Sequence, residues 1–234
     1  MVLFAGPSLG GVIMTTMISG RVGLRELLAH LLTWRLGIRW YALALLTGPL
    51  VVATVLLALS LVSPAYLPGI VTAEDRLVLL LFGIAWGLIG GGFLEELGWT
   101  GFAVPRLRRR HGILATATIV GVLWGVWHLP IAFWASGTLA GGQPVPVFAA
   151  GFLAFYMLAL PAFRLLMVWL YERTGSLLLS MLMHAAFSAG TLMLQPQSTA
   201  GYLTWNAVLA GALWAIAAGL VVAMHGNVHH PQDT

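Results

Sequence analysis

Long uncharged apolar stretches alternate with short polar ones along the whole chain. A lipid hydrocarbon core about 30 Å thick needs about 20 mainly apolar residues per helix. Seven stretches of about this length occur, at residues 1–20, 40–62, 77–104, 113–135, 145–171, 176–194 and 203–224. Only the third and the fifth contain charged residues, at Glu95-Glu96 and at Arg164 respectively. The pattern predicts an all-α, polytopic transmembrane helix bundle of about seven spans, folded as a single transmembrane domain over residues 1–234.

The composition excludes the common soluble classes. Apolar residues make up 60% of the chain, charged residues make up only 8%, and the mean hydropathy is +0.95. Soluble domains carry about 25% charged residues, and disordered or coiled-coil chains need many charged or polar residues as well. The chain also has no cysteine, which excludes disulfides, thiolate metal ligands and a cysteine nucleophile.

The basic residues are all arginines, eleven in number, and the net charge is +4. Short cytoplasmic loops collect arginine, whereas exported loops do not. With the amino end outside, ten arginines fall on the inner side: Arg21, Arg25, Arg35, Arg39, Arg106, Arg108, Arg109, Arg110, Arg164 and Arg173. We therefore expect a multi-pass protein of the bacterial inner membrane with its carboxyl end inside. The cluster Arg106, Arg108, Arg109 and Arg110 is expected to anchor the chain to membrane lipid and not to bind nucleic acid.

A carboxylate pair, Glu95-Glu96, lies inside the third apolar stretch. Each ionised side chain near the bilayer centre costs about 2.5 to 3.5 kcal/mol, so such residues are usually functional. Neighbours on a helix point about 100° apart, so one glutamate can face a cavity while the other braces a neighbouring helix. The preceding Gly90-Gly91-Gly92 predicts a close approach of two backbones or a bend in the helix.

Two histidines lie inside other apolar stretches, His128 in the fourth and His184 in the sixth. Counted at about 1.5 Å per residue from the inner ends, both histidines and Glu95 lie within one or two helical turns of the membrane midplane. Ser188 follows His184 by four residues and therefore shares its helical face. The depths predict one buried polar site built from three helices.

This set of groups is what the activation of a water molecule requires. Glu95, His128 and His184 could hold Zn²⁺ with one position open for water. A carboxylate without a metal could instead act as general base on that water. Two other interpretations stay open at this point, namely hydrogen-bonded packing residues and a proton relay.

Three segments resemble a known family in their order and spacing. They are EELGWTGF from residue 95, WGVWHLP from residue 124 and MLMHAAFS from residue 181. Together they resemble the CPBP family of intramembrane metalloproteases, which includes the type II CAAX prenyl endopeptidases. The resemblance extends over about residues 77–190, which form the motif-bearing core of the chain.

The resemblance implies a role for each polar residue of the site. Glu95 would activate water, His128 and His184 would be its partners or metal ligands, and Glu96 would be a supporting carboxylate. Thr100 stands where the family motif has an arginine, which removes a cation that could hold Glu96 or a substrate carboxylate. Ser188 replaces an asparagine; it can donate one hydrogen bond to an oxyanion but offers no amide pair.

We therefore expect an intramembrane endopeptidase that hydrolyses peptide bonds of membrane-embedded or lipid-anchored substrates. The first alternative is a catalytically degenerate membrane scaffold or a bacteriocin-immunity-type protein of the same fold. The second alternative is a small proton or ion carrier, which the absence of an inverted repeat disfavours.

Overall fold

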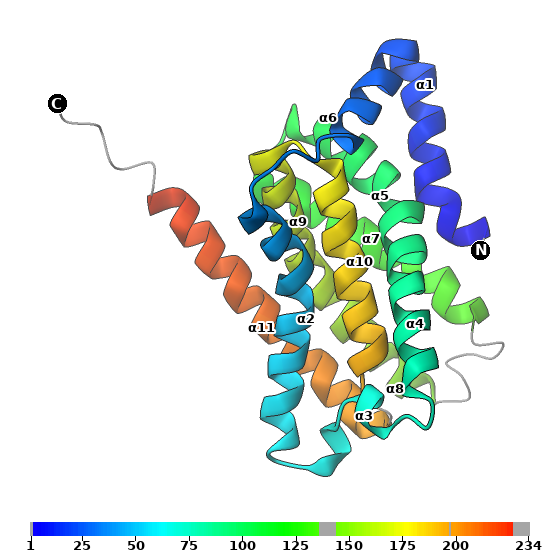
Figure 1. Cartoon of the computed structure of the whole chain (residues 1–234), viewed down its shortest axis with the longest axis vertical. Coiled ribbons are helices and arrows are strands. Elements are labelled where there is room, and N and C mark those ends of the chain that lie inside the picture. The colour runs from blue at the N-terminus through cyan, green and yellow to red at the C-terminus, as the bar shows by residue number, and fades with distance from the viewer. Residues whose placement is uncertain (1, 136–143, 197, 227–234) are drawn as a thin grey trace.

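A computed structural model (Figure 1) describes residues 2–135, 144–196 and 198–226, and these residues form helices and turns without a strand. The all-α prediction is confirmed. The helices are α1 (Val2–Leu31), α2 (Ile38–Ser60), α3 (Gly69–Thr72), α4 (Arg76–Trp86), α5 (Leu94–Gly98), α6 (Val104–Arg108), α7 (Ile113–Ala135), α8 (Val145–Phe152), α9 (Leu160–Thr174), α10 (Leu177–Leu194) and α11 (Thr199–Gly226). A 3₁₀ turn covers Pro64–Tyr66, and π-helical segments cover Gly87–Phe93, Trp99–Ala103 and Leu153–Ala159.

Six helices among the described residues are long and apolar enough to cross a membrane. They are Ile38–Ser60, Arg76–Arg108, Ile113–Pro130, Ala149–Thr174, Leu177–Leu194 and Gly201–Met224. These six correspond to the second to seventh predicted spans. The first predicted span forms the amino-terminal arm of α1 and is not one of the six. The backbone of α1 turns sharply after this arm, at Gly20 with φ 56°, and this conformation suits glycine because it has no Cβ.

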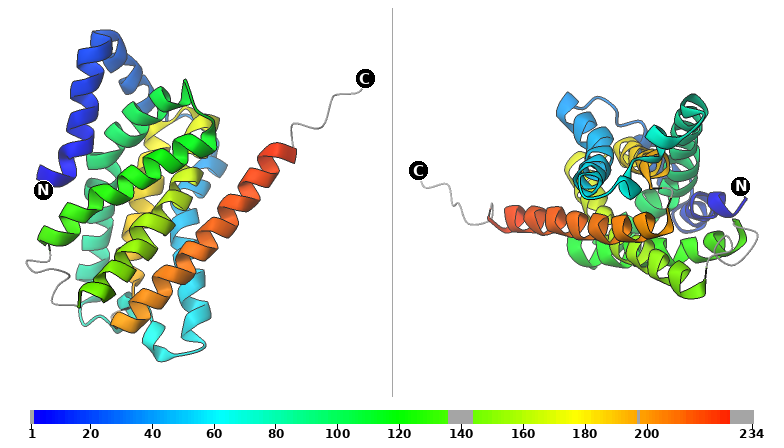
Figure 2. Two further views of the ribbon diagram at one scale, coloured as in Figure 1. Left: turned by 180° about the vertical axis from the view of Figure 1, so that it is seen from behind. Right: turned by 90° about the horizontal axis from the view of Figure 1, so that it is seen from below.

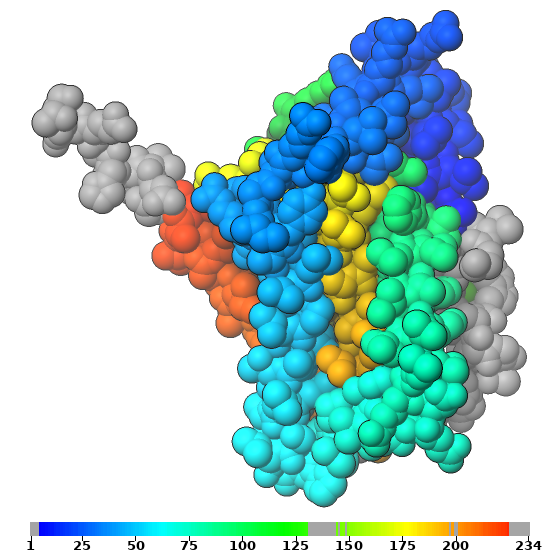
Figure 3. Space-filling view, viewed as in Figure 1, coloured from blue at the N-terminus to red at the C-terminus, as the bar shows by residue number. Residues whose placement is uncertain are grey.

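Two helices, α9 and α10, form the centre of the bundle. An 18-residue apolar stretch is 61% buried in each of their spans, against 33% or less in the other four spans. On one face α10 lies between α2 and α4 (Figures 1 and 3), and it packs against α9 on its other side. On the far face α7, α9 and α11 lie side by side (Figure 2). The side chains of α9 and α10 are therefore the ones held most firmly by packing.

A tight turn joins the two central helices. Gly175 ends α9 in the left-handed conformation, at φ 63°, which is the usual helix terminator. Ser176 then caps α10, because its hydroxyl accepts a hydrogen bond of 3.2 Å from the backbone N–H of Leu179. The two helices leave this turn antiparallel, which fixes the depth of their polar side chains relative to each other.

The glycines before the glutamate pair allow a close approach of two helices, as predicted. A Cβ atom on Gly92 would lie 2.9 Å from the carbonyl oxygen of Met181 on α10, and one on Gly91 would lie 3.0 Å from Nε2 of His184. Both distances are shorter than ordinary contacts, so larger residues would push the helices apart. The glycines thus bring the glutamates next to α10.

Candidate active site

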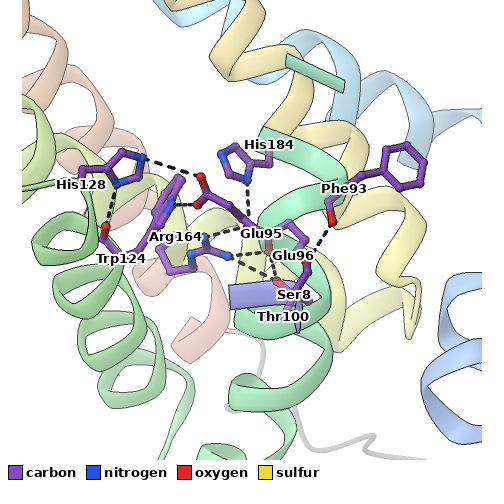
Figure 4. Close-up of polar contacts among 9 residues, drawn as sticks. All are labelled: Ser8, Phe93, Glu95, Glu96, Thr100, Trp124, His128, Arg164 and His184. Atoms are coloured by element: carbon purple, nitrogen blue, oxygen red, sulfur yellow. Dashed lines mark hydrogen bonds and ion pairs between the residues drawn. The ribbon is translucent and has the colours of Figure 1, made fainter. Parts of the chain in front are cut away.

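The glutamate pair lies on α5, between two π-helical segments. Such segments are rare, and they widen the helix locally, often at functional sites. Glu95 is 2% exposed and Glu96 is not exposed at all. The two side chains diverge, since Glu95 points toward α7 while Glu96 points toward α9 and α10 (Figure 4). The predicted division between a facing and a bracing carboxylate matches this arrangement.

The carboxylate of Glu96 is surrounded by donors. Its Oε1 accepts hydrogen bonds from Nδ1 of His184 at 2.8 Å and from Nη2 of Arg164 at 3.0 Å. Its Oε2 accepts from Nη1 of Arg164 at 2.8 Å and from the hydroxyl of Thr100. A carboxylate has about four acceptor sites, so Glu96 has none left for a substrate or a water. Its geometry is that of a group that holds other side chains in place.

Arg164 enters this network from α9 and is fully buried. Its guanidinium binds both oxygens of Glu96, its Nη1 lies 3.3 Å from the hydroxyl oxygen of Thr100, and its centre lies 4.1 Å from the ring of Trp124. Arg164, counted on the inner side at the end of the fifth predicted span, lies within the span Ala149–Thr174 and pairs with the buried carboxylate of Glu96. A buried arginine is stable only with such a partner.

Glu95 has a different environment from its neighbour. Its Oε2 accepts a hydrogen bond of 2.6 Å from the indole nitrogen of Trp124. Its Oε1 lies 3.9 Å from Nε2 of His128, which is too long for a direct hydrogen bond. Glu95 therefore keeps acceptor capacity on the oxygen that faces His128, in contrast to Glu96.

The partners of the two imidazoles define which ring nitrogen carries a proton. Nδ1 of His128 lies 2.8 Å from the carbonyl oxygen of Trp124, and Nδ1 of His184 lies 2.8 Å from Glu96. Carbonyl and carboxylate oxygens only accept hydrogen bonds, so we assign the proton to Nδ1 in both rings. Nε2 of His128 then faces Glu95, and Nε2 of His184 lies next to Gly91.

A cavity of about 360 Å³ lies against these groups. Glu95, His128, His184 and Ser188 all line it, so the structure brings four of the five predicted site residues to one space. Glu96 is the exception, because it lies behind the wall and reaches the cavity only through His184. Much of the remaining wall is aromatic, from Trp86, Trp124, Phe155, Tyr156, Phe187, Tyr202 and Trp205.

Three residues that shape the site were not among the predicted ones. Trp124 holds Glu95, Arg164 holds Glu96, and Tyr156 stacks on His128 with ring centroids 4.7 Å apart. A signal for Arg164 existed in the sequence, since it is a charge inside an apolar stretch. Trp124 also had a signal, since it begins the WGVWHLP segment four residues before His128. Tyr156 carries no such signal, because aromatic residues are ordinary in a membrane helix.

The predicted metal ligands are Glu95, His128 and His184. Among the described residues, no three His, Cys, Asp or Glu side chains form a group that could hold a metal ion. Nδ1 of each histidine is engaged, which leaves Nε2 as the ring nitrogen that could bind an ion. Oε1 of Glu95 and Nε2 of His128 lie 3.9 Å apart, and no third such side chain joins them as a group among the described residues. As they stand, the described side chains therefore do not form a three-ligand zinc site.

Comparison with known proteins supports the resemblance seen in the motifs. Residues 77–190 match the model of a family described as type II CAAX prenyl endopeptidase, Rce1-like. The CAAX prenyl protease 2 of Methanococcus maripaludis is 38% identical over 39 residues, which are 17% of this chain and 14% of that protein. The resemblance to this membrane protease family is thus confirmed for the motif-bearing core. With six apolar spans among its described residues, the chain is an integral, multi-pass membrane protein.

Proposed function

We propose that this chain, whose residues 77–190 match the Rce1-like CAAX endopeptidases, is an intramembrane endopeptidase that hydrolyses its substrates with a water activated by Glu95. Its substrates are membrane-embedded or lipid-anchored peptides and proteins, and its location is the bacterial inner membrane. One observation carries the proposal: two acceptor atoms, Oε1 of Glu95 and Nε2 of His128, face each other at 3.9 Å on the cavity wall.

Two facing acceptors repel each other unless a donor lies between them. A water molecule has two O–H groups and can donate one to each acceptor at ordinary hydrogen-bond lengths when they lie 3.9 Å apart. The pair is thus suited to holding one water with its oxygen lone pairs free. That water would be oriented for attack on a carbonyl carbon in the cavity.

The proposed reaction balances without any other reagent. The water oxygen forms a bond to the peptide carbonyl carbon while one of its protons passes to Oε1 of Glu95. The carbonyl oxygen becomes an oxyanion, and we assign to Ser188, which lines the cavity, the hydrogen bond that stabilises it. Glu95 then gives its proton to the departing nitrogen as the C–N bond breaks, leaving a carboxylic acid and an amine.

The assignment of roles to the two glutamates follows from their contacts. Glu95 makes one hydrogen bond that the structure describes, to Trp124, whereas Glu96 makes four. A general base needs a free acceptor, and Glu95 has one. The proposed steps use these side chains and one water, and none of them uses a metal ion.

The cellular test compares the protein fragments in membranes of cells that produce the wild-type protein or Glu95→Gln. New amino termini that appear only with the wild-type protein would identify substrates and support the proposal. Glu172→Gln is the matched control, since Glu172 is a half-exposed glutamate that pairs with Arg108 away from the cavity. The same set of termini in wild-type and Glu95→Gln cells would contradict the proposal.

A second candidate function is a non-catalytic scaffold or immunity-type protein. The observation that favours it is the threonine at position 100 in place of an arginine. Deletion of the gene defines which cellular trait depends on the protein. If cells with Glu95→Ala or His184→Ala still show that trait as wild-type cells do, the scaffold is the better account. Loss of the phenotype in both variants, with the proteins still in the membrane, supports the protease.

A further inference from the structure

We propose that Arg164 is a positioning residue of the proposed protease, which aligns both of its carboxylates from behind the cavity wall. This inference depends on the proposed function only for its activity readout. Arg164 lies on α9, a different helix from the glutamates, and it does not line the cavity. It therefore acts on the reacting groups through its neighbours and does not touch a substrate.

The first route leads from Arg164 through Glu96 to His184. The guanidinium binds both oxygens of Glu96, at 2.8 and 3.0 Å, so the plane of the carboxylate cannot rotate. Oε1 of this fixed carboxylate then accepts the Nδ1 proton of His184 at 2.8 Å. Nε2 of His184 is thereby left as the ring nitrogen at the cavity. Without Arg164, the carboxylate loses two of its four donors and the orientation of the imidazole is no longer fixed.

The second route leads from Arg164 through Trp124 to Glu95. The guanidinium centre lies 4.1 Å from the centroid of the indole, within the range of a cation–π contact. The same indole donates its N–H to Oε2 of Glu95 at 2.6 Å. The edge of this ring also meets His184, with centroids 4.7 Å apart. Arg164 thus stabilises the position of Trp124, which binds Glu95, and through Glu96 that of His184.

The requirement is for an arginine and not only for a positive charge. A lysine ammonium binds as a point charge, whereas the planar guanidinium can engage two oxygens and an aromatic face together. Arg164 uses all of these features at once (Figure 4). A lysine at this position would keep the charge and lose the alignment.

Residue 100 offers an independent route for a cation to the same carboxylate. Thr100 lies four residues after Glu96 on nearly the same helical face, and its hydroxyl already contacts both Glu96 and Arg164. An arginine introduced at position 100 could therefore reach Glu96 from its own side. We therefore expect an arginine at either position 100 or position 164 to pair with Glu96, provided that only one of the two arginines is present.

The test measures the cleavage of a synthetic peptide that spans a cleavage site found in the cellular comparison of wild-type and Glu95→Gln membranes. Four purified variants in vesicles are assayed, with the wild-type protein as reference. We expect Arg164→Met to lower kcat by about 100-fold with a smaller change in KM, and Arg164→Lys to fall between Arg164→Met and the wild type. Thr100→Arg alone should be slower than the wild-type protein, since two guanidinium groups compete for one carboxylate. The double variant Arg164→Met/Thr100→Arg should be at least tenfold faster than Arg164→Met. A double variant no faster than Arg164→Met, or wild-type kcat in Arg164→Met, would overturn the inference.

An NMR measurement that does not require catalytic activity tests the role of Arg164 separately from the proposed function. In ¹⁵N-histidine NMR spectra, the signal of His184, assigned by its loss in His184→Gln, should show a protonated Nδ1 in the wild-type protein. In Arg164→Met this state should be mixed with the other tautomer. An unchanged His184 signal would contradict the positioning role, even if no Glu95-dependent cleavage were found. Wild-type cleavage that Glu95→Gln retains would contradict only the proposed function.

Discussion

The indole nitrogen of Trp124 donates a hydrogen bond of 2.6 Å to Oε2 of Glu95, and this contact links the α7 and α5 helices inside the membrane. It occupies one oxygen of the glutamate and leaves the other toward His128. The backbone carbonyl of the same tryptophan accepts a hydrogen bond from His128. Trp124 therefore sets the positions of both groups that face each other across 3.9 Å.

Trp124→Phe removes this donor and keeps an aromatic ring in the same place. A hydrogen bond to a charged group contributes about 1.5–3 kcal/mol, so we expect kcat to fall by about 10- to 150-fold. Trp127→Phe is the matched control on the same helix, because the indole nitrogen of Trp127 has no hydrogen-bond partner in the described part of the chain. Equal rates for the two variants in a cleavage assay would show that the contact to Glu95 does not matter.

Gly91→Ala tests the space beside the imidazole. A Cβ atom there would lie 2.8 Å from Oγ of Ser188 and 3.0 Å from Nε2 of His184, so the methyl group would displace the side chains of the cavity wall. We expect cleavage to fall by at least about tenfold, since small displacements of reacting groups are costly. The control Gly219→Ala adds a methyl group with no heavy atom within 4 Å and should leave the rate unchanged.

The free energy of unfolding distinguishes the buried ion pair from an exposed one. Glu96→Ala leaves Arg164 buried without its partner, which should lower the unfolding free energy by about 3–5 kcal/mol. Glu172→Ala breaks the half-exposed pair with Arg108, at 3.2 Å, and should cost less than about 1 kcal/mol because solvent screens it. Denaturant titration in mixed micelles measures both values. A small loss for Glu96→Ala would contradict the structural importance of the Glu96–Arg164 pair.

Removal of metal ions tests how the water is activated. Because the described side chains form no three-ligand group, we expect cleavage to continue after treatment with a strong chelator. The assay compares the treated protein with the same protein after addition of Zn²⁺. Loss of activity on chelation and its recovery with Zn²⁺ would contradict the mechanism through Glu95 alone.

The spans and the depth of the polar residues were predictable because both depend only on distance along the chain. Apolar stretches identify spans by length, and a constant rise per residue places Glu95, His128 and His184 at similar depths. The structure brings all three to one cavity. The sequence was informative here because charge inside lipid is costly and therefore rare.

The rotation of each helix was not predictable from the same information. Apart from Thr116, Thr118 and His128, α7 carries apolar residues and glycines, so hydropathy alone does not show which face of this helix turns inward. The contact of Trp124 with Glu95 depends on that rotation, which packing determines. The partner of Arg164 was not predictable for a related reason. A count of arginines on each side of the membrane does not detect a carboxylate that pairs with one of them from another helix.

The central claim is that the free oxygen of Glu95 activates the attacking water. The most direct measurement is the rate of peptide cleavage in vesicles by purified Glu95→Gln, which keeps the shape of the side chain but not its basicity. General base catalysis typically contributes about 10²- to 10⁴-fold, so we predict a loss of at least about 100-fold, while Glu172→Gln retains the wild-type rate. A folded Glu95→Gln protein that cleaves as fast as the wild type would contradict the account.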